Sequence, residues 1–329
     1  MPPERAARCT RQDVARLAEV SPAVVSYVIN GGPRPVAPAT RARVEQAIAE
    51  LGYRPNKTAS ALARGRSQQV GLVVVDTTNP FYAELAAAID HELFLRGLTL
   101  ITVSAAHRPT DSEATTLEFL AEHDVRAVIF ATSVTPAEVA YATVQALPFV
   151  VLNEMAPAPG ISSAVVDYRA AAVEAVRHLV GHGRRRIGFV GRFFDDLRYL
   201  GWREALDDAG LPPGPAVDCG WSIDVGYDAG RRLAAERQLD GLFVASDELA
   251  MGCIAGLREG GLSVPDDVAI VAFDGTRCGR YIGPGLTTMA QPIDRLAADA
   301  VALVLDAEAK PGTHLSYSAQ MVVRGSCGC

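Results

Sequence analysis

Short runs of hydrophobic residues alternate with amphipathic segments through most of the chain. The run at 70–75 is apolar at almost every position, as expected of a strand that is buried on both faces of a parallel sheet. The segment 81–96 that follows spaces its apolar residues as a helix does. The same pattern predicts strands at 98–103, 127–131, 149–152, 187–190, 241–245 and 268–273, and helices at 111–122, 168–180, 197–209, 225–235 and 248–259.

This alternation of strands and helices predicts right-handed βαβ units and therefore parallel sheets. The series begins again after residue 152, which indicates two similar lobes. A ligand of such a protein binds beyond the carboxyl ends of the strands, where the lobes face each other. Residues that end strands are therefore the candidate binding residues.

The first 53 residues follow a different pattern, which predicts three short helices. Val14, Leu17 and Ala18 lie at i, i+3 and i+4, on one face of the first helix. Ser21 and Pro22 are typical of the start of a second helix, because serine caps the free N–H groups and proline fits the first turn. The residues expected to be buried in the second and third helices are Val25, Val28, Ile29, Val44, Ala47, Ile48 and Leu51. This pattern fits a helix-turn-helix, but it also fits other small helical bundles.

Charge divides the chain at about the same place. Residues 1–66 contain 11 Lys and Arg against 5 Asp and Glu, whereas the remainder contains 20 against 33. The net charge of −7 therefore conceals a basic N-terminal part. This distribution is expected of a nucleic-acid-binding module on an acidic carrier.

The sequence shows no signature of an enzyme, a cofactor or a metal site. No GxGxxG follows the strand at 70–75, and neither a GxxxxGK[ST] loop nor a GxSxG elbow occurs. The six cysteines form no CxxC pair and the histidines are interpreted as lacking metal-binding spacing, so we expect reduced thiols, no metal and no cofactor. The absence of a secretion signal and of a long apolar run predicts a cytoplasmic protein with no membrane span.

A longer series of residues supports a specific assignment. It comprises Asp13-Val14-Ala15, Val20-Ser21, Val25-Ser26, Val28-Ile29-Asn30-Gly31, Thr40-Arg41, Val44 and Leu51-Gly52-Tyr53-Arg54-Pro55-Asn56. In order and spacing, apart from a slightly longer loop at 31–36, the series resembles the LacI/GalR family of bacterial transcription regulators. The resemblance continues in Asn79-Pro80-Phe81, Arg198-Tyr199-Leu200-Gly201-Trp202, Ala245-Ser246-Asp247, Phe273-Asp274, Thr287-Thr288 and Gln291.

The resemblance implies a fold and its domain boundaries. The fold would be a small all-α helix-turn-helix head joined to a two-lobed α/β body with parallel sheets, like that of periplasmic binding proteins. Residues 1–53 would form the DNA-binding domain and 54–67 a hinge helix with a linker. Residues 68–329 would form the effector-binding and dimerisation domain.

In the head, the resemblance implies that the helix at 22–29 lies in the major groove of DNA. Pro22, Ala23 and Tyr27 would meet base edges. The residues implied to contact phosphates are Thr10, Ser21, Ser26, Asn30 and Thr40. Asn56 would cap the hinge helix, and Leu62 would insert between bases at the centre of the operator and bend it.

Three departures from the family pattern affect this head, and one of them is Val24, where the middle of the helix often has Thr. Tyr27 stands where the family often has Arg or His, so the reading face lacks a bidentate guanine contact. We therefore expect sequence to be read through thymine methyl groups, which Ala23 can meet, and through DNA shape. Glu19 stands where the turn often has Gly or Asn, and a positive φ at this position would cost about 1–2 kcal/mol.

In the body, the resemblance implies an effector, which is a sugar in many members. Arg198 and Asp274 would hold its hydroxyl groups, and Trp221 and Phe81 would stack on its apolar face unless they belong to the core. The remaining predicted contacts are Asp76, Ser246 and Phe273. Asp247 is expected to cap the helix at 248–259 rather than to touch the ligand.

We therefore expect a homodimeric transcriptional regulator, a repressor and not an enzyme. It would bind a near-palindromic double-stranded operator. A carbohydrate bound between its lobes would control its affinity for the operator. The chain ends shortly after its last strand region, without the leucine heptads of tetrameric members, which favours a dimer. A nucleobase or other metabolite acting as corepressor is the alternative effector. An exported sugar-binding protein is a further alternative, which leaves residues 11–64 unexplained.

Overall fold

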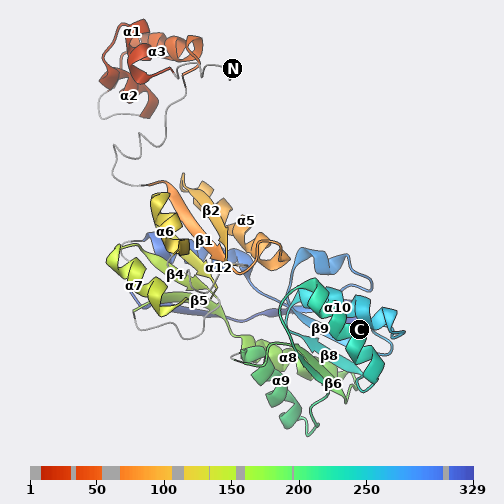
Figure 1. The fold of residues 1–329 in the computed structure, drawn as a ribbon. Helices are drawn as coiled ribbons and strands as arrows, with labels where there is room; N and C mark the ends of the chain where they lie inside the picture. Colours follow the sequence, from red (N-terminus) through yellow and green to blue (C-terminus); the bar gives the residue numbers. More distant parts are fainter. Residues whose placement is uncertain are drawn as a thin grey trace, which may run out of the picture. The chain divides into compact units, whose positions relative to one another are not determined.

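The computed structural model describes residues 9–30, 35–53, 67–105, 115–132, 134–152, 160–194, 196–306 and 311–329. Contacts divide the chain into two compact units, Met1–Ser67 and Gln68–Cys329, which we call the N-terminal unit and the body (Figure 1). The predicted hinge helix falls at 54–66, outside the described residues. The finer division of the N-terminal unit into a head and a hinge therefore stays a prediction.

The described part of the N-terminal unit consists of α1 (Arg11–Leu17), α2 (Pro22–Asn30) and α3 (Pro38–Glu50). Val14, Val25 and Val44, one from each helix, are fully buried. Leu17 was expected in this core, but 45% of it is exposed, and Ala15 is buried instead. Val14, Ala15 and Ala18, at i, i+1 and i+4, form the face that packs against α2 and α3, and Leu17 lies beside this face.

The starts of α1 and α2 follow from local hydrogen bonds. Thr10 and Asp13 form a capping box, in which each side chain binds the backbone N–H of the other. Ser21 Oγ accepts the N–H of Val24 at 3.4 Å, which supports the predicted start of α2. Between the two helices, Glu19 has φ of +52°, so the strained turn expected from the sequence is present.

The first lobe of the body is a sheet with the strand order β11-β5-β4-β3-β1-β2 and parallel pairing throughout. Its strands are β1 (Gln69–Val74), β2 (Thr99–Ser104), β3 (Val125–Ala131), β4 (Phe149–Leu152), β5 (Ser162–Val166) and β11 (His314–Tyr317). Leu72 of β1 faces α5 (Pro80–Phe94) and α12 (Ile293–Leu305). Val73 faces α6 (Thr115–Glu122) and α7 (Pro136–Val144) on the other side.

The second lobe repeats this arrangement with the strand order β12-β10-β9-β8-β6-β7. Its strands are β6 (Ile187–Gly191), β7 (Ala216–Asp218), β8 (Gly241–Val244), β9 (Ala269–Asp274), β10 (Thr287–Ala290) and β12 (Gln320–Val322), and only the β10–β12 pair among those described is antiparallel. One face packs on α8 (Tyr168–Gly181) and α9 (Leu197–Asp208). The other packs on α10 (Ile223–Glu236) and α11 (Asp247–Glu259). Short 3-10 turns, η2 (Arg277–Arg280) and η3 (Gly325–Cys327), complete the lobe.

The described chain passes between the lobes at three places, between β5 and α8, between β10 and α12, and between β11 and β12. These crossings bring the last part of the sequence back to both sheets. None of the described helices is long and apolar enough to cross a membrane.

The alternation of strands and helices expected between residues 70 and 273 is confirmed, but several elements were not predicted. The missed strands β5, β7, β10, β11 and β12 span only 5, 3, 4, 4 and 3 residues. Unlike β4 and β8, which are four residues long and apolar, these strands contain polar residues and no long apolar run, so their pairing with neighbouring strands defines them. The helices α7 and α12 were also missed, although Leu296, Ala300 and Val304 of α12 show helical spacing.

Candidate ligand-binding cleft

The body encloses a cavity of about 570 Å³ between its two lobes. Residues that follow strands of both sheets form its walls, among them Asp76 after β1, Arg192 after β6, Ser246 after β8 and Asp274 at the end of β9. Parallel strands bring their carboxyl ends to the same edge of a sheet, which explains why residues so distant in sequence meet here. The cavity therefore lies at the ends of the strands, where the ligand site was predicted.

Arg198 enters this cavity from the first turn of α9. Its Nε and Nη2 donate to the two carboxylate oxygens of Asp196 at 2.9 and 3.1 Å, and its Nη1 donates to the Ala245 carbonyl at 2.8 Å. Burial alone would lower the pKa of Arg198, but the Asp196 carboxylate raises it, and the net direction is upward. The guanidinium is therefore charged, neutralised by a bidentate partner and fixed in position.

Asp196 holds Arg198 in a second way. It is the N-cap of α9, and its Oδ1 also accepts the backbone N–H of Arg198 at 2.9 Å. Only 7% of Asp196 is exposed. The first turn of α9 thus sets the direction of the arginine before any ligand is present.

Three aromatic rings surround this guanidinium. Its central carbon lies 5.0 Å from the ring centre of Tyr168, 4.7 Å from that of Trp221 and 5.4 Å from that of Phe273. Tyr168 and Trp221 line the cavity, whereas Phe273 is fully buried and does not. This corrects the expectation that Phe273 touches the ligand. Neighbouring residues of a strand point to opposite faces, so Phe273 packs edge-on against Tyr168 while Asp274 reaches the cavity.

The first lobe supplies a second aromatic wall. Phe81 and Tyr82 both line the cavity, with their ring centres 5.2 Å apart in an edge-to-face arrangement. Asn79 precedes them as the N-cap of α5, and its Oδ1 accepts the N–H of Phe81 at 2.9 Å. The Asn79-Pro80-Phe81 sequence therefore starts a helix and places an aromatic ring in the wall at the same time.

Two carboxylates are buried next to each other, Asp274 in the wall of the cavity and Asp247 behind it. Asp274 accepts the side-chain N–H of Gln291 at 2.9 Å and the backbone N–H of Asp247 at 3.4 Å. Asp247 accepts the Thr276 N–H and Oγ1–H, both at 2.7 Å, and the Thr288 Oγ1–H at 2.6 Å. Burial raises the pKa of Asp274 well above its usual range, and repulsion from Asp247 adds to this effect. Burial also raises the pKa of Asp247, to about 6, against the opposing effect of its threonine donors.

The cap of α11 differs from the prediction. Ser246, not Asp247, is the N-cap, and its Oγ accepts the N–H of Leu249 at 3.2 Å. Ser246 also lines the cavity, as expected. Asp247 is fully buried and ties α11 to Thr276 and Thr288 in the neighbouring strand region.

Gln291 carries an acceptor that a ligand could use. Its Nε2 donates to Asp274, but its buried Oε1 has no hydrogen-bond partner among the described residues. A buried acceptor without a partner costs free energy, on the order of 1–3 kcal/mol. Because Gln291 lines the cavity, a hydroxyl or N–H group of a bound ligand can satisfy it.

The N-terminal unit places the predicted DNA contacts as follows. Pro22 and Ala23 are exposed at the start of α2, and Ser26, Tyr27 and Thr40 are half-buried. Thr10 and Ser21 act as helix caps and are exposed. The side chain of Asn30, together with Asn56 and Leu62, lies outside the described residues.

Known proteins match almost the whole chain. Residues 10–56 match the family described as bacterial regulatory proteins, lacI family, and residues 176–327 match the periplasmic binding protein-like domain. Catabolite control protein A of Priestia megaterium is 34% identical over 304 residues, which are 90% of this chain and 91% of that protein.

The chain belongs to the LacI family of bacterial regulatory proteins.

Solved structures of the LacI family share its fold. The transcriptional regulator CelR in complex with cellobiose is 28% identical with a TM-score of 0.70, over 97% of this chain and all of that one. The Lac repressor dimer bound to operator and the anti-inducer ONPF is 24% identical with a TM-score of 0.84, over 97% and 99% of the two chains. This protein is therefore a DNA-binding transcriptional regulator with an effector, not an enzyme.

Several residues of this LacI-family protein that line the cavity, and Asp196, which holds Arg198 in place, were not predicted as site residues from the sequence. Asp196 could have been found, because an aspartate just before a helix is an N-cap signal. Tyr168 follows β5, and Gln291 follows β10, two strands that were themselves not predicted. Arg192 and Glu248 also line the cavity. Burial and the nearby Asp76 raise the pKa of Glu248, so this wall of the cavity is acidic.

Proposed function

We propose that this chain is a homodimeric repressor whose operator affinity is set by a sugar bound between the lobes. The observation that supports a sugar is the composition of the cavity. Aromatic faces from both lobes, Phe81, Tyr82, Tyr168 and Trp221, alternate with fixed hydrogen-bonding groups. A pyranose ring offers the matching surfaces, an apolar face for stacking and hydroxyl groups around its edge.

The charges of the cavity favour a neutral ligand. Arg198 is already neutralised by Asp196, so it can donate a hydrogen bond without offering a free positive charge. Asp76 and Glu248 add carboxylates to the same cavity. A phosphorylated or carboxylated effector would meet these groups with like charge, whereas carboxylates are good acceptors for hydroxyl groups.

The predicted contacts can be given roles on this basis. We propose that Asp76, Asp274 and Gln291 accept hydrogen bonds from the sugar and that Ser246 adds a short polar contact. Trp221 and Phe81 would stack on the sugar ring. Phe273 would pack against Tyr168 and Arg198 from the core side. The CelR complex with cellobiose is a related case in which the bound molecule is a sugar.

On DNA, we propose that two copies of α2 enter successive major grooves of a near-palindromic operator. Pro22, Ala23 and Tyr27 would face the bases, and Thr10, Ser21, Ser26, Asn30 and Thr40 the phosphates. Asn56 and Leu62 would belong to a hinge helix that orders on DNA and bends it, with 54–67 as its extent. A regulator must share a compartment with the chromosomal DNA that it binds, so we propose a cytoplasmic location.

The effector can be tested by calorimetric titration of the full chain with monosaccharides, disaccharides and nucleobases. We expect at least one sugar to bind, and Trp221→Ala to weaken it by about 10-fold, since an aromatic contact contributes around 0.5–1.5 kcal/mol beyond its buried area. Tyr281→Ala is the matched control, because Tyr281 is 79% exposed and is not among the residues lining the cavity. Binding of nucleobases alone would favour the corepressor alternative.

The DNA partner needs a separate test. Selection from random double-stranded oligonucleotides at low salt should yield a near-palindromic sequence. Failure to bind any duplex under these conditions would refute the operator proposal, whatever the calorimetry shows.

A further inference from the structure

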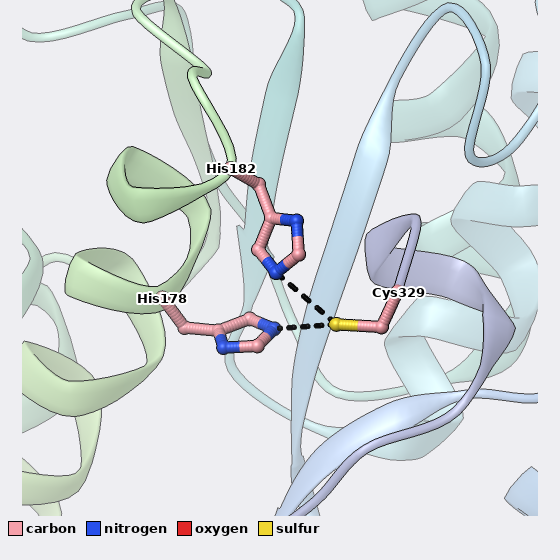
Figure 2. A group of neighbouring side chains, drawn as sticks. All are labelled: His178, His182 and Cys329. Atoms are coloured by element: carbon pink, nitrogen blue, oxygen red, sulfur yellow. Dashed lines mark hydrogen bonds between the residues drawn. The ribbon is translucent and has the colours of Figure 1, made fainter.

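Two histidines and a cysteine meet on the surface of the second lobe, away from the cavity residues (Figure 2). His178 lies in the last turn of α8, His182 is the C-cap of that helix, and Cys329 follows η3. The Cys329 Sγ lies 3.1 Å from His182 Nε2 and 3.6 Å from His178 Nε2. All three ligand atoms lie within 4.8 Å of one another.

These distances fit a tetrahedral metal ion. With Zn–S near 2.3 Å and Zn–N near 2.0–2.1 Å, tetrahedral angles separate the sulfur from each nitrogen by about 3.5 Å. The observed separations of 3.1 and 3.6 Å lie on either side of this value. Both histidines present Nε2 toward the same sulfur, so a small shift of the side chains would make room for the ion (Figure 2).

Part of this signal is in the sequence. His178 and His182 are four residues apart on one helix, a spacing that places both rings on the same face. The expectation that the histidines lack metal-binding spacing overlooked this pair. Cys329 is far away in the sequence, and only the fold brings it to the end of α8.

Both sides of the cluster are fixed by packing. Just before Cys329, Ser326 and Cys327 are fully buried, and Ser326 Oγ donates to the Ile270 carbonyl in β9 at 2.8 Å while accepting the Thr287 N–H at 2.8 Å. On the other side, Leu179 of α8 is fully buried in the core. Metal ligands carried by such elements lose little freedom when they bind, which favours affinity.

We propose that His178, His182 and Cys329 form a site for a zinc-class divalent ion. Two imidazole nitrogens and a thiolate are the donors that zinc prefers, whereas calcium and magnesium require oxygen ligands. Three protein ligands leave a fourth position for water or another small ligand. The ion would join α8 to the segment that follows β12, two parts of the second lobe that are distant in sequence.

The site is separate from the effector cavity. Tyr168 at the start of α8 lines the cavity, whereas His178 is ten residues further along, about 15 Å at the rise of an α-helix. Zinc binding can therefore be tested independently of the sugar, and failure of one proposal leaves the other intact.

The test uses the full chain prepared without a polyhistidine tag and kept reduced. After equilibrium dialysis against zinc, we expect one zinc per chain. Cobalt, which replaces zinc and is coloured, should give a thiolate-to-metal absorption band. Zinc should also raise the unfolding temperature, because it binds the folded state in preference.

Matched variants decide the outcome. His182→Asn and Cys329→Ser should each lower the affinity for zinc by more than about 10-fold, because losing a residue that only supports a ligand already costs about that much. Cys329→Ser should also abolish the thiolate band. His91→Asn and Cys219→Ser change the same residue types elsewhere and should leave both readouts unchanged. The proposal is overturned if the wild type retains no zinc, or if zinc binding and the cobalt band are the same in Cys329→Ser as in the wild type.

Discussion

Five of the described non-glycine residues have a positive φ, a conformation that side chains disfavour, and two of them, Asp274 and Glu19, stand where function is expected. Asp274 has φ of +123° at the end of β9, where its carboxylate must turn toward the cavity. Glu19 has φ of +52° in the turn between α1 and α2. Such conformations cost about 1–3 kcal/mol each and persist where the surrounding structure requires them. For Glu19, the requirement is the angle between α1 and α2 in the helix-turn-helix.

The strain at Glu19 predicts a stabilising substitution. Glu19→Asn should increase the stability of the N-terminal unit by up to about 1 kcal/mol, because asparagine adopts the left-handed region more readily than glutamate. Hydrogen exchange of the α1 and α2 amides in the full chain, without DNA, measures this gain. The control is Glu50→Asn, an exposed position in the helical conformation at the end of α3, where no gain is expected. Equal protection in Glu19→Asn and wild type would show that the turn is not strained.

At the scale of the element, we propose that α2 defines which DNA bases the N-terminal unit can recognise. Its start is fixed by Ser21 and Pro22, and its inner face by Val25 and Val28. The outer face contains no arginine or lysine, so the usual two hydrogen bonds to guanine are unavailable. The helix should therefore discriminate weakly by hydrogen bonding and more strongly by methyl contacts and by the shape of the groove.

This reasoning predicts a change of operator in Tyr27→Arg. The new guanidinium can pair with O6 and N7 of guanine, so selection from random duplexes should enrich guanine at one position of each half-site, by about 1–3 kcal/mol of discrimination. Arg43→Ala, an exposed change on α3, should alter affinity across all sequences without changing the selected one. An unchanged operator in Tyr27→Arg would exclude a reading role for this position.

At the scale of the whole molecule, the effector can act through the angle between the lobes. The lobes are joined by three crossings of the described chain and by a hydrogen bond from the Arg277 N–H to Glu84 Oε1 at 2.9 Å. We propose that a ligand in the cavity favours one angle and that this angle sets whether two hinge helices meet on DNA. Coupling requires that the ligand bind the two arrangements with different affinity.

The coupling predicts that DNA binding and effector response can be separated. Asp274→Asn should keep operator affinity near that of the wild type, while the effector concentration needed to change operator binding rises by about 10-fold or more, since a buried polar group left without its hydrogen-bond partner costs about 1–3 kcal/mol. Fluorescence anisotropy of a labelled operator measures both quantities. Asp228→Asn, exposed on α10, is the control. A normal response in Asp274→Asn would mean that the effector binds elsewhere.

The proposed dimer has its own test. Sedimentation of the protein as a stable tetramer would contradict it.

The sequence by itself determined the features that depend on local spacing. Helical periodicity and the Ser21-Pro22 cap predicted the three N-terminal helices, and the alternation of apolar runs with helices predicted two parallel sheets. Because ligands gather at the carboxyl ends of parallel strands, Asp76, Arg198, Ser246 and Asp274 could be chosen before their partners were known.

Only the tertiary structure decided which neighbours those residues meet. Phe273 and Asp274 are adjacent in the sequence, yet the pleat of β9 sends one into the core and the other into the cavity. Gln291 joins the site because β10 pairs with β9, and Cys329 reaches His182 because the segment after β12 packs against β9. Local pattern fixes most helices and the apolar strands of this protein, whereas the short mixed strands and the contacts between distant segments depend on how the sheets assemble, which no single stretch of sequence encodes.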